Sequence, residues 1–360
     1  MTTLFFFILG LLLLIWGAEW MVRGSIRLAA RLGISPLIIG LTVVAFGTSS
    51  PELAVVLRSS LIGSADISIG NVVGSNIFNV LIVLGASAVV APLTVSGQLI
   101  RSDVPVMILA SFATFLFCLD GRLSTTDAVV LVLCGGLYVF WLIRASKKQN
   151  RVNSLELPSK ALSSRQSSSL LPQIGLVIFG IFLLAVGAKW LVDSAMVFAQ
   201  VLGVSELVVG LTIVAGGTSL PEVATSVLAA FKGERDLAVG NVVGSNLFNI
   251  FLVLGVAGII SPGGIPVSPA AIYFDFPVML AVAVACLPIF FTGNVISRWE
   301  GAVFLGYYVA YALYLFLASS DHDALASIYS TVMLLFVLPI TALTLAVVTW
   351  RAIRRQQTRI

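Results

Sequence analysis

The strongest constraint on this chain is an internal duplication, because two copies of one unit must fold alike and still pack together. Three pairs of segments match at a constant offset of 170 residues, and the best pair is identical in nine of eleven letters. The pairs are GAEW (17–20) with GAKW (187–190), LGISPLIIGLTVVAFGTSSPE (32–52) with LGVSELVVGLTIVAGGTSLPE (202–222), and GNVVGSNIFNV (70–80) with GNVVGSNLFNI (240–250). After a slip of two residues, DVP (103–105) also matches DFP (275–277).

The duplicated segments lie in long apolar stretches. Of the 360 residues, 59% are hydrophobic and 10% are charged, and the mean hydropathy of +1.09 excludes a soluble domain. The apolar runs are continuous rather than alternating, which indicates membrane-spanning helices and not a barrel. Eleven spans are predicted, near 3–27, 35–61, 68–92, 104–119, 126–144, 171–198, 205–231, 237–262, 275–292, 299–318 and 329–350.

Each half contains five of these spans, so the second half must insert upside down relative to the first. The predicted fold class is an all-α polytopic membrane protein with two inverted five-helix repeats, ten transmembrane helices in all, plus one extra C-terminal transmembrane helix. The predicted divisions are a first repeat over 1–145, a cytoplasmic linker over 146–170, a second repeat over 171–320, and the extra helix with a basic tail over 321–360. Inverted repeats with interrupted helices are typical of transporters, whose binding sites lie near the midplane between the repeats.

The distribution of basic residues predicts the orientation. When the spans alternate, 17 of the 20 Lys and Arg fall on the side of the linker and the C-terminus. Positively charged loops stay in the cytoplasm, so we expect a multi-pass protein of the cell (inner) membrane with its N-terminus outside and its C-terminus cytoplasmic. The net charge of +4 then needs no nucleic acid partner, and the lipid bilayer is the expected surrounding.

Several kinds of chemistry are excluded by what the spans lack. Cys118, Cys134 and Cys286 all lie in apolar runs and are expected to be buried thiols rather than disulfides or metal ligands. The one histidine, His322, lies in a loop, and no GxSxG motif is present, so an intramembrane hydrolase is not expected. We predict a transporter that is not an enzyme and needs no cofactor.

The motif GTS-x-PE places a helix breaker and an acid inside an apolar span of each half. Pro51 and Pro221 lack a backbone N–H, so each span should unwind or kink at GTS, with Ser50 expected to cap the helix that follows. A kink alone would account for the proline. It would not account for Glu52 and Glu222, since a charge near mid-membrane costs roughly 2.5–3.5 kcal/mol even on a lenient scale. Two such acids in matched positions indicate a functional site.

The motif GNVVGSN-x-FN supplies a second polar cluster in each half. Ser75 and Asn79 are one helical turn apart, so they share a face that we expect to look toward the acids, and Ser245 and Asn249 are their counterparts. The motif's glycines and its other asparagines are equally explained by close helix packing, and this alternative stays open for Gly70, Gly74, Gly240, Gly244, Asn71, Asn76, Asn241 and Asn246.

Together these groups form an all-oxygen set of ligands with a formal charge of −2. Hard cations prefer such ligands, and Ca²⁺ takes roughly 6–8 oxygens. The set offers no thiolate or imidazole, which disfavours softer transition metals. The charge balances one Ca²⁺, two protons or a few Na⁺, which is the logic of an exchanger. A cation channel would need no counter-ion, and the broken, inverted spans argue against it.

At these residues the chain resembles the Ca²⁺/cation antiporter superfamily, and within it the prokaryotic sodium/calcium exchangers. The resemblance covers about residues 1–320 and is carried by both motifs, each present twice. It implies a ten-helix fold in which the first and sixth helices slide across the site, with Ca²⁺ and Na⁺ as transported ions. The implied ion ligands are Glu52, Glu222, Thr48, Thr218, Ser49, Ser219, Ser75, Ser245, Asn79, Asn249 and the backbone of Ala45 and Ala215.

One position departs from the pattern of some family members. Where they carry an aspartate, this chain has Asn249, so the site holds two acids and not three. Proton-coupled relatives and some Na⁺-coupled ones share the neutral pattern. Two hypotheses therefore stay open: an antiporter that exchanges Ca²⁺ for Na⁺, and a Ca²⁺/H⁺ antiporter that uses the same two glutamates. The sequence predicts no oligomeric state and no role for the extra helix.

Overall fold

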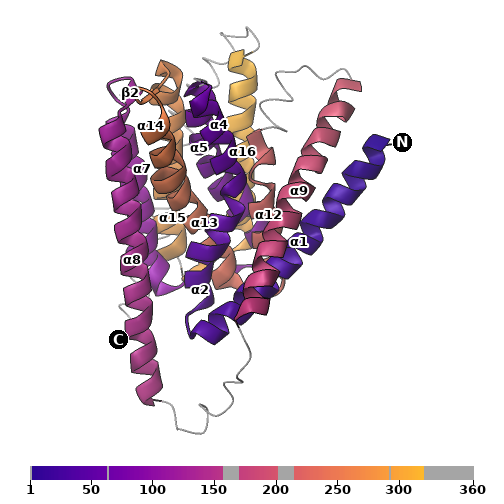
Figure 1. The fold of residues 1–360 in the computed structure, drawn as a ribbon, viewed down its shortest axis with the longest axis vertical. Coiled ribbons are helices and arrows are strands. Elements are labelled where there is room, and N and C mark those ends of the chain that lie inside the picture. Colours follow the sequence, from indigo (N-terminus) through magenta and orange to yellow (C-terminus); the bar gives the residue numbers. More distant parts are fainter. Residues whose placement is uncertain (1, 63–64, 157–169, 202–214, 292, 320–360) are drawn as a thin grey trace.

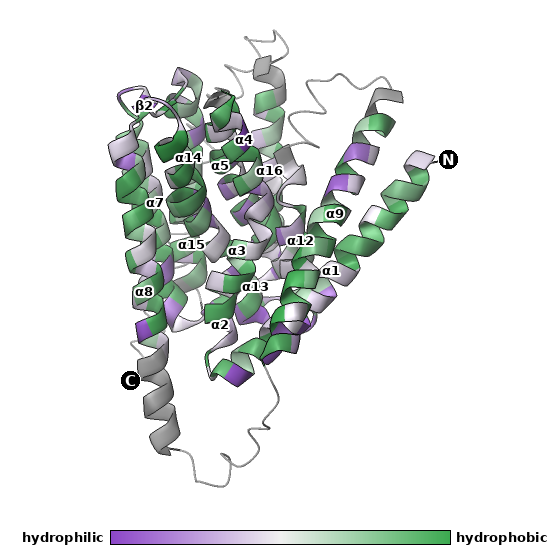
Figure 2. Ribbon diagram, in the orientation of Figure 1, coloured by the Kyte–Doolittle hydropathy of each residue, from purple (hydrophilic) through white to green (hydrophobic). Residues whose placement is uncertain are grey.

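The computed structural model describes residues 2–62, 65–156, 170–201, 215–291 and 293–319, which form a bundle of helices (Figure 1). Seven of these helices are long and apolar enough to cross a membrane, and a bent pair forms an eighth candidate. Large apolar side chains such as Leu109, Leu137 and Phe182 are exposed on the outer helices, where Figure 2 shows mostly hydrophobic residues. Such a surface is stable only against lipid.

The elements repeat in the same order along the two halves, with π-helical segments labelled η. In the first half they are α1 (Thr2–Leu32), α2 (Pro36–Ile39), η1 (Gly40–Val44), α3 (Ala45–Thr48), α4 (Ser50–Leu61), α5 (Ala65–Phe78), η2 (Asn79–Leu84), α6 (Gly85–Val90), β1 (Leu93–Thr94), η3 (Leu99–Asp103), α7 (Val104–Phe117), β2 (Arg122–Leu123) and α8 (Thr125–Glu156). In the second half they are α9 (Leu171–Val201), α11 (Ala215–Gly217), α12 (Leu220–Phe231), α13 (Arg235–Phe248), η6 (Asn249–Leu254), α14 (Gly255–Ile260), β3 (Ile265–Pro266), η7 (Ala271–Asp275), α15 (Phe276–Phe291), β4 (Val295–Ile296) and α16 (Arg298–Ser319).

One helix and one cysteine depart from the expectations drawn from the sequence. The span predicted at 126–144 is part of a longer helix, α8, which continues to Glu156 through a polar stretch of the sequence. The helix α16 covers the span predicted at 299–318. Cys134, expected to be buried, is exposed on α8.

Parts of the predicted architecture lie outside the described residues. They include residues 157–169 of the linker over 146–170, residues 205–214 of the span at 205–231, and the extra helix and tail over 321–360.

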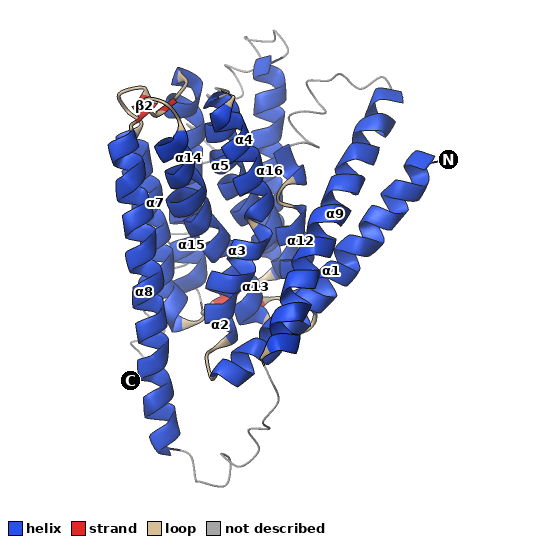
Figure 3. Cartoon of the chain, in the orientation of Figure 1, coloured by secondary structure: helices blue, strands red, loops and turns tan. Residues whose placement is uncertain are grey.

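Two short sheets join the halves at the ends of the bundle (Figure 3). The strand β1 pairs antiparallel with β4, and β2 pairs antiparallel with β3. Since β1 and β3 hold equivalent places in the two halves, as do β2 and β4, each sheet contains one strand from either half. The loops of the two halves are thus tied to each other by backbone hydrogen bonds.

The DVP and DFP segments place one aspartate in each half beside a tyrosine. Asp103 is fully buried and accepts a hydrogen bond of 2.9 Å from the hydroxyl of Tyr138 on α8. Asp275 accepts one of 3.0 Å from the hydroxyl of Tyr311 on α16. Each pair anchors the last helix of its half to the start of the preceding helix, which gives this repeated motif a packing role.

The helices α1 and α9 cross each other in close contact at the side of the bundle (Figure 1). A Cβ built on Gly17 would lie 2.9 Å from the carbonyl oxygen of Gly180, and one on Gly180 would lie 2.8 Å from that of Gly17. Gly10 and Gly187 make the same reciprocal approach. Because both neighbours are backbone, neither helix can yield locally, and only glycine fits at this seam.

This seam predicts a specific sensitivity to small substitutions. We expect Gly180→Ala to destabilise the protein by about 1–3 kcal/mol, since overpacking against a backbone cannot be relieved by a side-chain rotation. The measurement is thermal unfolding of the purified protein in detergent.

The matched control is Gly175→Ala on the same helix, where an added Cβ would meet nothing within 4 Å. It should leave the unfolding temperature unchanged or raise it slightly, because alanine favours the helix. Equal unfolding temperatures for the two variants would contradict the proposed role of the seam.

Candidate cation site

The first broken span begins the site. The segments Pro36–Thr48 and Ser50–Leu61 are bent by 45° at Ser49, which confirms the break predicted at GTS. Pro51 cannot donate to the carbonyl of Gly47, and the hydroxyl of Ser50 donates to that oxygen instead, at 2.5 Å. The expectation that Ser50 caps the helix was wrong, because Ser49 holds the capping position and Ser50 is already helical.

The second broken span has the same form in its described part. The helix α11 ends at Gly217 and α12 begins at Leu220, with Ser219 in the capping position and proline in the first turn. Neither Ser49 nor Ser219 forms a hydrogen bond that caps its own helix. Their hydroxyl groups are thereby available to the opposite half of the molecule.

The two glutamates are fully buried, and each accepts a hydrogen bond from a serine of the other half. Ser219 Oγ lies 3.0 Å from Glu52 Oε1, and Ser49 Oγ lies 3.2 Å from Glu222 Oε1. The two carboxylates are also close enough to interact electrostatically. Neither forms an ion pair with a Lys or Arg of the described residues.

A second layer of hydroxyl and amide groups surrounds Glu222. Ser245 Oγ lies 3.4 Å from Glu222 Oε1 and 3.3 Å from Thr48 Oγ1. Thr48 also donates to Asn241 Oδ1 at 3.2 Å, and Asn241 in turn donates to Ser226 Oγ at 2.9 Å. This chain of contacts ties α3 of the first half to α12 and α13 of the second.

Asn79 and Asn249 stand where the helices widen from α to π geometry, at the first residues of η2 and η6. Such widened turns occur often at functional sites. Asn79 Nδ2 donates to Asn246 Oδ1 at 3.1 Å, and Asn249 Nδ2 donates to Asn76 Oδ1 at 3.0 Å. Both amides therefore use their nitrogen atoms for contacts between the halves, and their oxygen atoms have no hydrogen-bond partner in the described part of the chain.

The site is rich in buried oxygen atoms that lack a hydrogen-bond partner among the described residues. They are Glu52 Oε2, Glu222 Oε2, Ser75 Oγ, Asn71 Oδ1, Asn79 Oδ1 and Asn249 Oδ1. A buried acceptor without a partner is costly, so natural proteins keep such atoms where a ligand satisfies them. The chemistry of this set suits a hard cation, and no group of three or more His, Cys, Asp or Glu offers an alternative metal centre within the described part of the chain.

Most residues that the family resemblance implied as ligands come together here. Glu52, Glu222, Ser49, Ser219, Thr48, Ser75, Ser245, Asn79, Asn249 and Ala45 are all buried. Thr218 is half-buried and accepts a hydrogen bond of 3.5 Å from Asn71. Ala215 begins α11, and its side chain lies outside the described part.

Sequence reasoning missed one member of this network and left others open. Ser226 lies one turn after Glu222 on α12, so the i,i+4 spacing could have indicated it, but its counterpart in the first half is Val56. Asn76, Asn241 and Asn246, for which helix packing was an equal alternative, all form hydrogen bonds within or beside the site.

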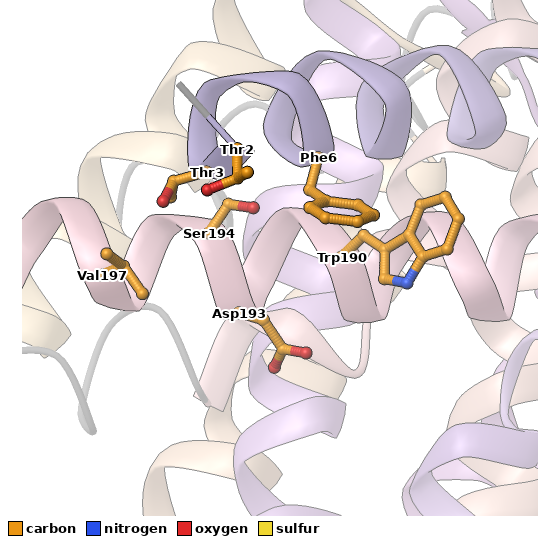
Figure 4. Close-up of a pocket in the computed structure, with 7 residues that line it drawn as sticks. All are labelled: Thr2, Thr3, Phe6, Trp190, Asp193, Ser194 and Val197. Atoms are coloured by element: carbon orange, nitrogen blue, oxygen red, sulfur yellow. The ribbon is translucent and has the colours of Figure 1, made fainter.

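A pocket of about 310 Å³ lies elsewhere, between the start of α1 and the end of α9. Thr2, Thr3, Phe6, Trp190, Asp193, Ser194 and Val197 line it (Figure 4). The rings of Phe6 and Trp190 meet edge to face across it, and the carboxylate of Asp193 points away from the two threonines (Figure 4). The pocket contains no member of the buried oxygen set and is not the candidate site.

Comparison with known proteins assigns the family. The sequence model described as "Sodium/calcium exchanger protein" matches residues 2–144 and 172–317. Inner membrane protein YrbG of Escherichia coli is 39% identical over 278 residues, which cover 77% of this chain and 85% of that protein. Sodium/calcium exchanger MaX1 of Methanosarcina acetivorans is 35% identical over 86% of this chain and 97% of its own length.

The solved structures agree with the sequence relatives. A structure of the sodium-calcium exchanger NCX_Mj, soaked without Na⁺ and Ca²⁺, superposes with a TM-score of 0.73 at 32% identity and covers 85% of this chain and 96% of that one. The buried cation-type site, the matching family model and this shared fold lead to one conclusion: the chain belongs to the sodium/calcium exchanger family of membrane cation antiporters.

Proposed function

We propose that this protein exchanges Ca²⁺ for Na⁺ across the cell membrane through the site around Glu52 and Glu222. The observation that carries the proposal is the cluster of buried acceptor oxygens without hydrogen-bond partners among the described residues. Two of these atoms belong to carboxylates that form no ion pair with a described basic side chain. A divalent cation would neutralise both charges and satisfy the free oxygens at once.

The ligands for Ca²⁺ are proposed from the geometry of the two glutamates. Each carboxylate has one oxygen held by a serine hydroxyl and one that is free, so its orientation is fixed before the ion arrives. The free oxygens of Asn79 and Asn249 supply neutral ligands from η2 and η6. Two carboxylates and two amide oxygens match the preference of Ca²⁺ for hard oxygen ligands.

The flanking Na⁺ sites are proposed from the hydroxyl groups and the backbone of the broken spans. A serine hydroxyl can donate its proton to a carboxylate and still offer a lone pair to a cation. Ser49, Ser219 and Ser245 stand in this position. Ser75 and the carbonyl groups of Ala45 and Ala215 would add further oxygens, while Thr48 and Thr218 would add oxygens to the Ca²⁺ site. Na⁺ ions bound there would compete with Ca²⁺ for the charge of the same two glutamates.

Transport requires that this one site open to either side in turn. We propose that the two halves are inverted repeats of five helices each, followed by an extra C-terminal helix, as the odd number of spans predicts. Support comes from the sheets, each of which contains one strand from either half. The tightly packed α1 and α9 would slide across the site to give alternating access, with the N-terminus outside and the C-terminus in the cytoplasm.

A Ca²⁺/H⁺ antiporter is the second candidate, and the neutral residue at position 249 is compatible with either coupling ion. With two acids and no basic partner among the described residues, the site balances two protons as well as it balances Ca²⁺. In that case Glu52 and Glu222 would carry the protons, and the flanking hydroxyls would have only a structural role.

The first test removes one charge from the site. We expect Glu222→Gln, and equally Glu52→Gln, to reduce Ca²⁺ uptake into proteoliposomes by more than roughly 100-fold, because loss of even an outer-shell partner costs about 10- to 100-fold in metal affinity. Glutamine keeps the volume and the oxygen that accepts from serine, so the variants should fold. Uptake of ⁴⁵Ca²⁺ is the measurement.

The matched control for this test is Glu234→Gln, which removes an acid whose side chain makes no capping hydrogen bond at the start of α13. Its uptake should equal that of the wild type. Full exchange by Glu222→Gln would show that the cation site lies elsewhere.

The second test identifies the coupling ion. Proteoliposomes are loaded so that either an outward Na⁺ gradient or a pH gradient is present, with the voltage clamped. We expect ⁴⁵Ca²⁺ uptake with the Na⁺ gradient alone. Uptake only with the pH gradient would replace the proposed function with Ca²⁺/H⁺ antiport.

A further inference from the structure

We propose that Asn76 and Asn246 are positioning residues that orient the amide groups of Asn79 and Asn249, so that oxygen and not nitrogen faces the cation. The inference rests on the proposed function and adds two residues that hold its neutral ligands in place. It starts from the ambiguity of an asparagine side chain. The amide oxygen and nitrogen are nearly equal in size, yet only the oxygen can bind a cation.

The contacts that set the orientation cross between the halves. Asn249 Nδ2 donates to Asn76 Oδ1 at 3.0 Å, and Asn79 Nδ2 donates to Asn246 Oδ1 at 3.1 Å. In both cases the acceptor is a side-chain amide oxygen, which could not accept from another oxygen. A flipped Asn249 would bring two oxygen atoms together, and a flipped Asn79 would do the same.

The orientation of Asn76 and Asn246 is fixed in turn by a second pair of contacts. Asn76 Nδ2 donates to the backbone oxygen of Asn246 at 3.4 Å, and Asn246 Nδ2 donates to the backbone oxygen of Asn76 at 3.3 Å. Each nitrogen also lies near a methionine sulfur, Met279 Sδ at 3.7 Å and Met107 Sδ at 3.6 Å. Carbonyl oxygen and thioether sulfur are both acceptors, so these two amides cannot turn over either.

The four asparagines thus form a chain of hydrogen bonds, in which Asn76 and Asn246 bond reciprocally in the middle and each accepts from one outer asparagine. All are buried, and the oxygens of Asn79 and Asn249 are the amide oxygens that remain free in it. Helix packing alone would not require this polarity, since any uncharged side chains of similar volume would fill the space. The polarity is explained if two neutral oxygens must be presented to an ion beside the two carboxylates.

The experiment removes the orienting side chain, Asn76, in two backgrounds: one in which residue 249 is an amide that must be oriented, and one in which it is a carboxylate that need not be. Asn76→Ala deletes the acceptor of Asn249, and we expect the Kd for Ca²⁺ to rise roughly 3- to 10-fold, the equivalent of one hydrogen bond. Asn249→Asp places a carboxylate there, which presents an oxygen whichever way it turns. In the Asn249→Asp background the amide oxygen of Asn76 no longer has a donor at position 249, so Asn76→Ala should leave the Kd unchanged or lower it.

Equilibrium ⁴⁵Ca²⁺ binding to the purified protein in detergent is the measurement, with thermal unfolding recorded for each variant. If Asn76 had only a structural role, Asn76→Ala would raise the Kd by the same factor in both backgrounds and would lower the unfolding temperature in both. That result would overturn the inference. If Asn76→Ala does not fold, the mirror pair is used, Asn246→Ala with and without Asn79→Asp. If the wild-type protein binds no Ca²⁺, the proposed function itself is wrong. This outcome differs from an equal loss of Ca²⁺ affinity in the two backgrounds, which would contradict only the role of Asn76.

Discussion

Two buried carboxylates that form no ion pair with a described basic side chain are the constraint on which the rest of this structure depends. Each is held by a serine from the opposite half, Glu52 by Ser219 and Glu222 by Ser49. Burial of a charge without a counter-charge is expensive. The fold meets part of this cost with directed hydroxyl groups, and in the proposed function a bound cation would supply the missing charge.

The exchange of contacts between the halves extends through the whole site. The threonine of each GTS motif meets an asparagine of the opposite half, and the asparagines that open η2 and η6 do the same. The strands at the ends of the bundle also pair across the halves. Neither half can therefore complete a cation site alone, which is a physical reason for the duplication to be kept within one chain.

The two halves are not equal, and the differences lie close to the site. Ser226 has no counterpart in the first half, where Val56 occupies the equivalent position. Ser50 of the first half is replaced by Leu220 in the second. Ser50 relieves the carbonyl of Gly47 that Pro51 leaves without a donor. In their described parts the two broken spans thus start the second helix alike, with serine in the capping position and proline in the first turn. They differ in the side chains around the break, so the two glutamates have different surroundings.

The sequence by itself determined the membrane class, the two copies, the break at GTS and the two acids, because each depends on composition or on local backbone chemistry at Pro51 and Pro221. It could not decide whether Asn76 and Asn246 serve packing or the site, since that depends on which atoms meet across the halves. Nor did it indicate the close seam of Gly17 and Gly180, or the widened turns at Asn79 and Asn249. Those features arise only when helices distant in sequence are brought within contact, and tertiary structure alone sets that geometry.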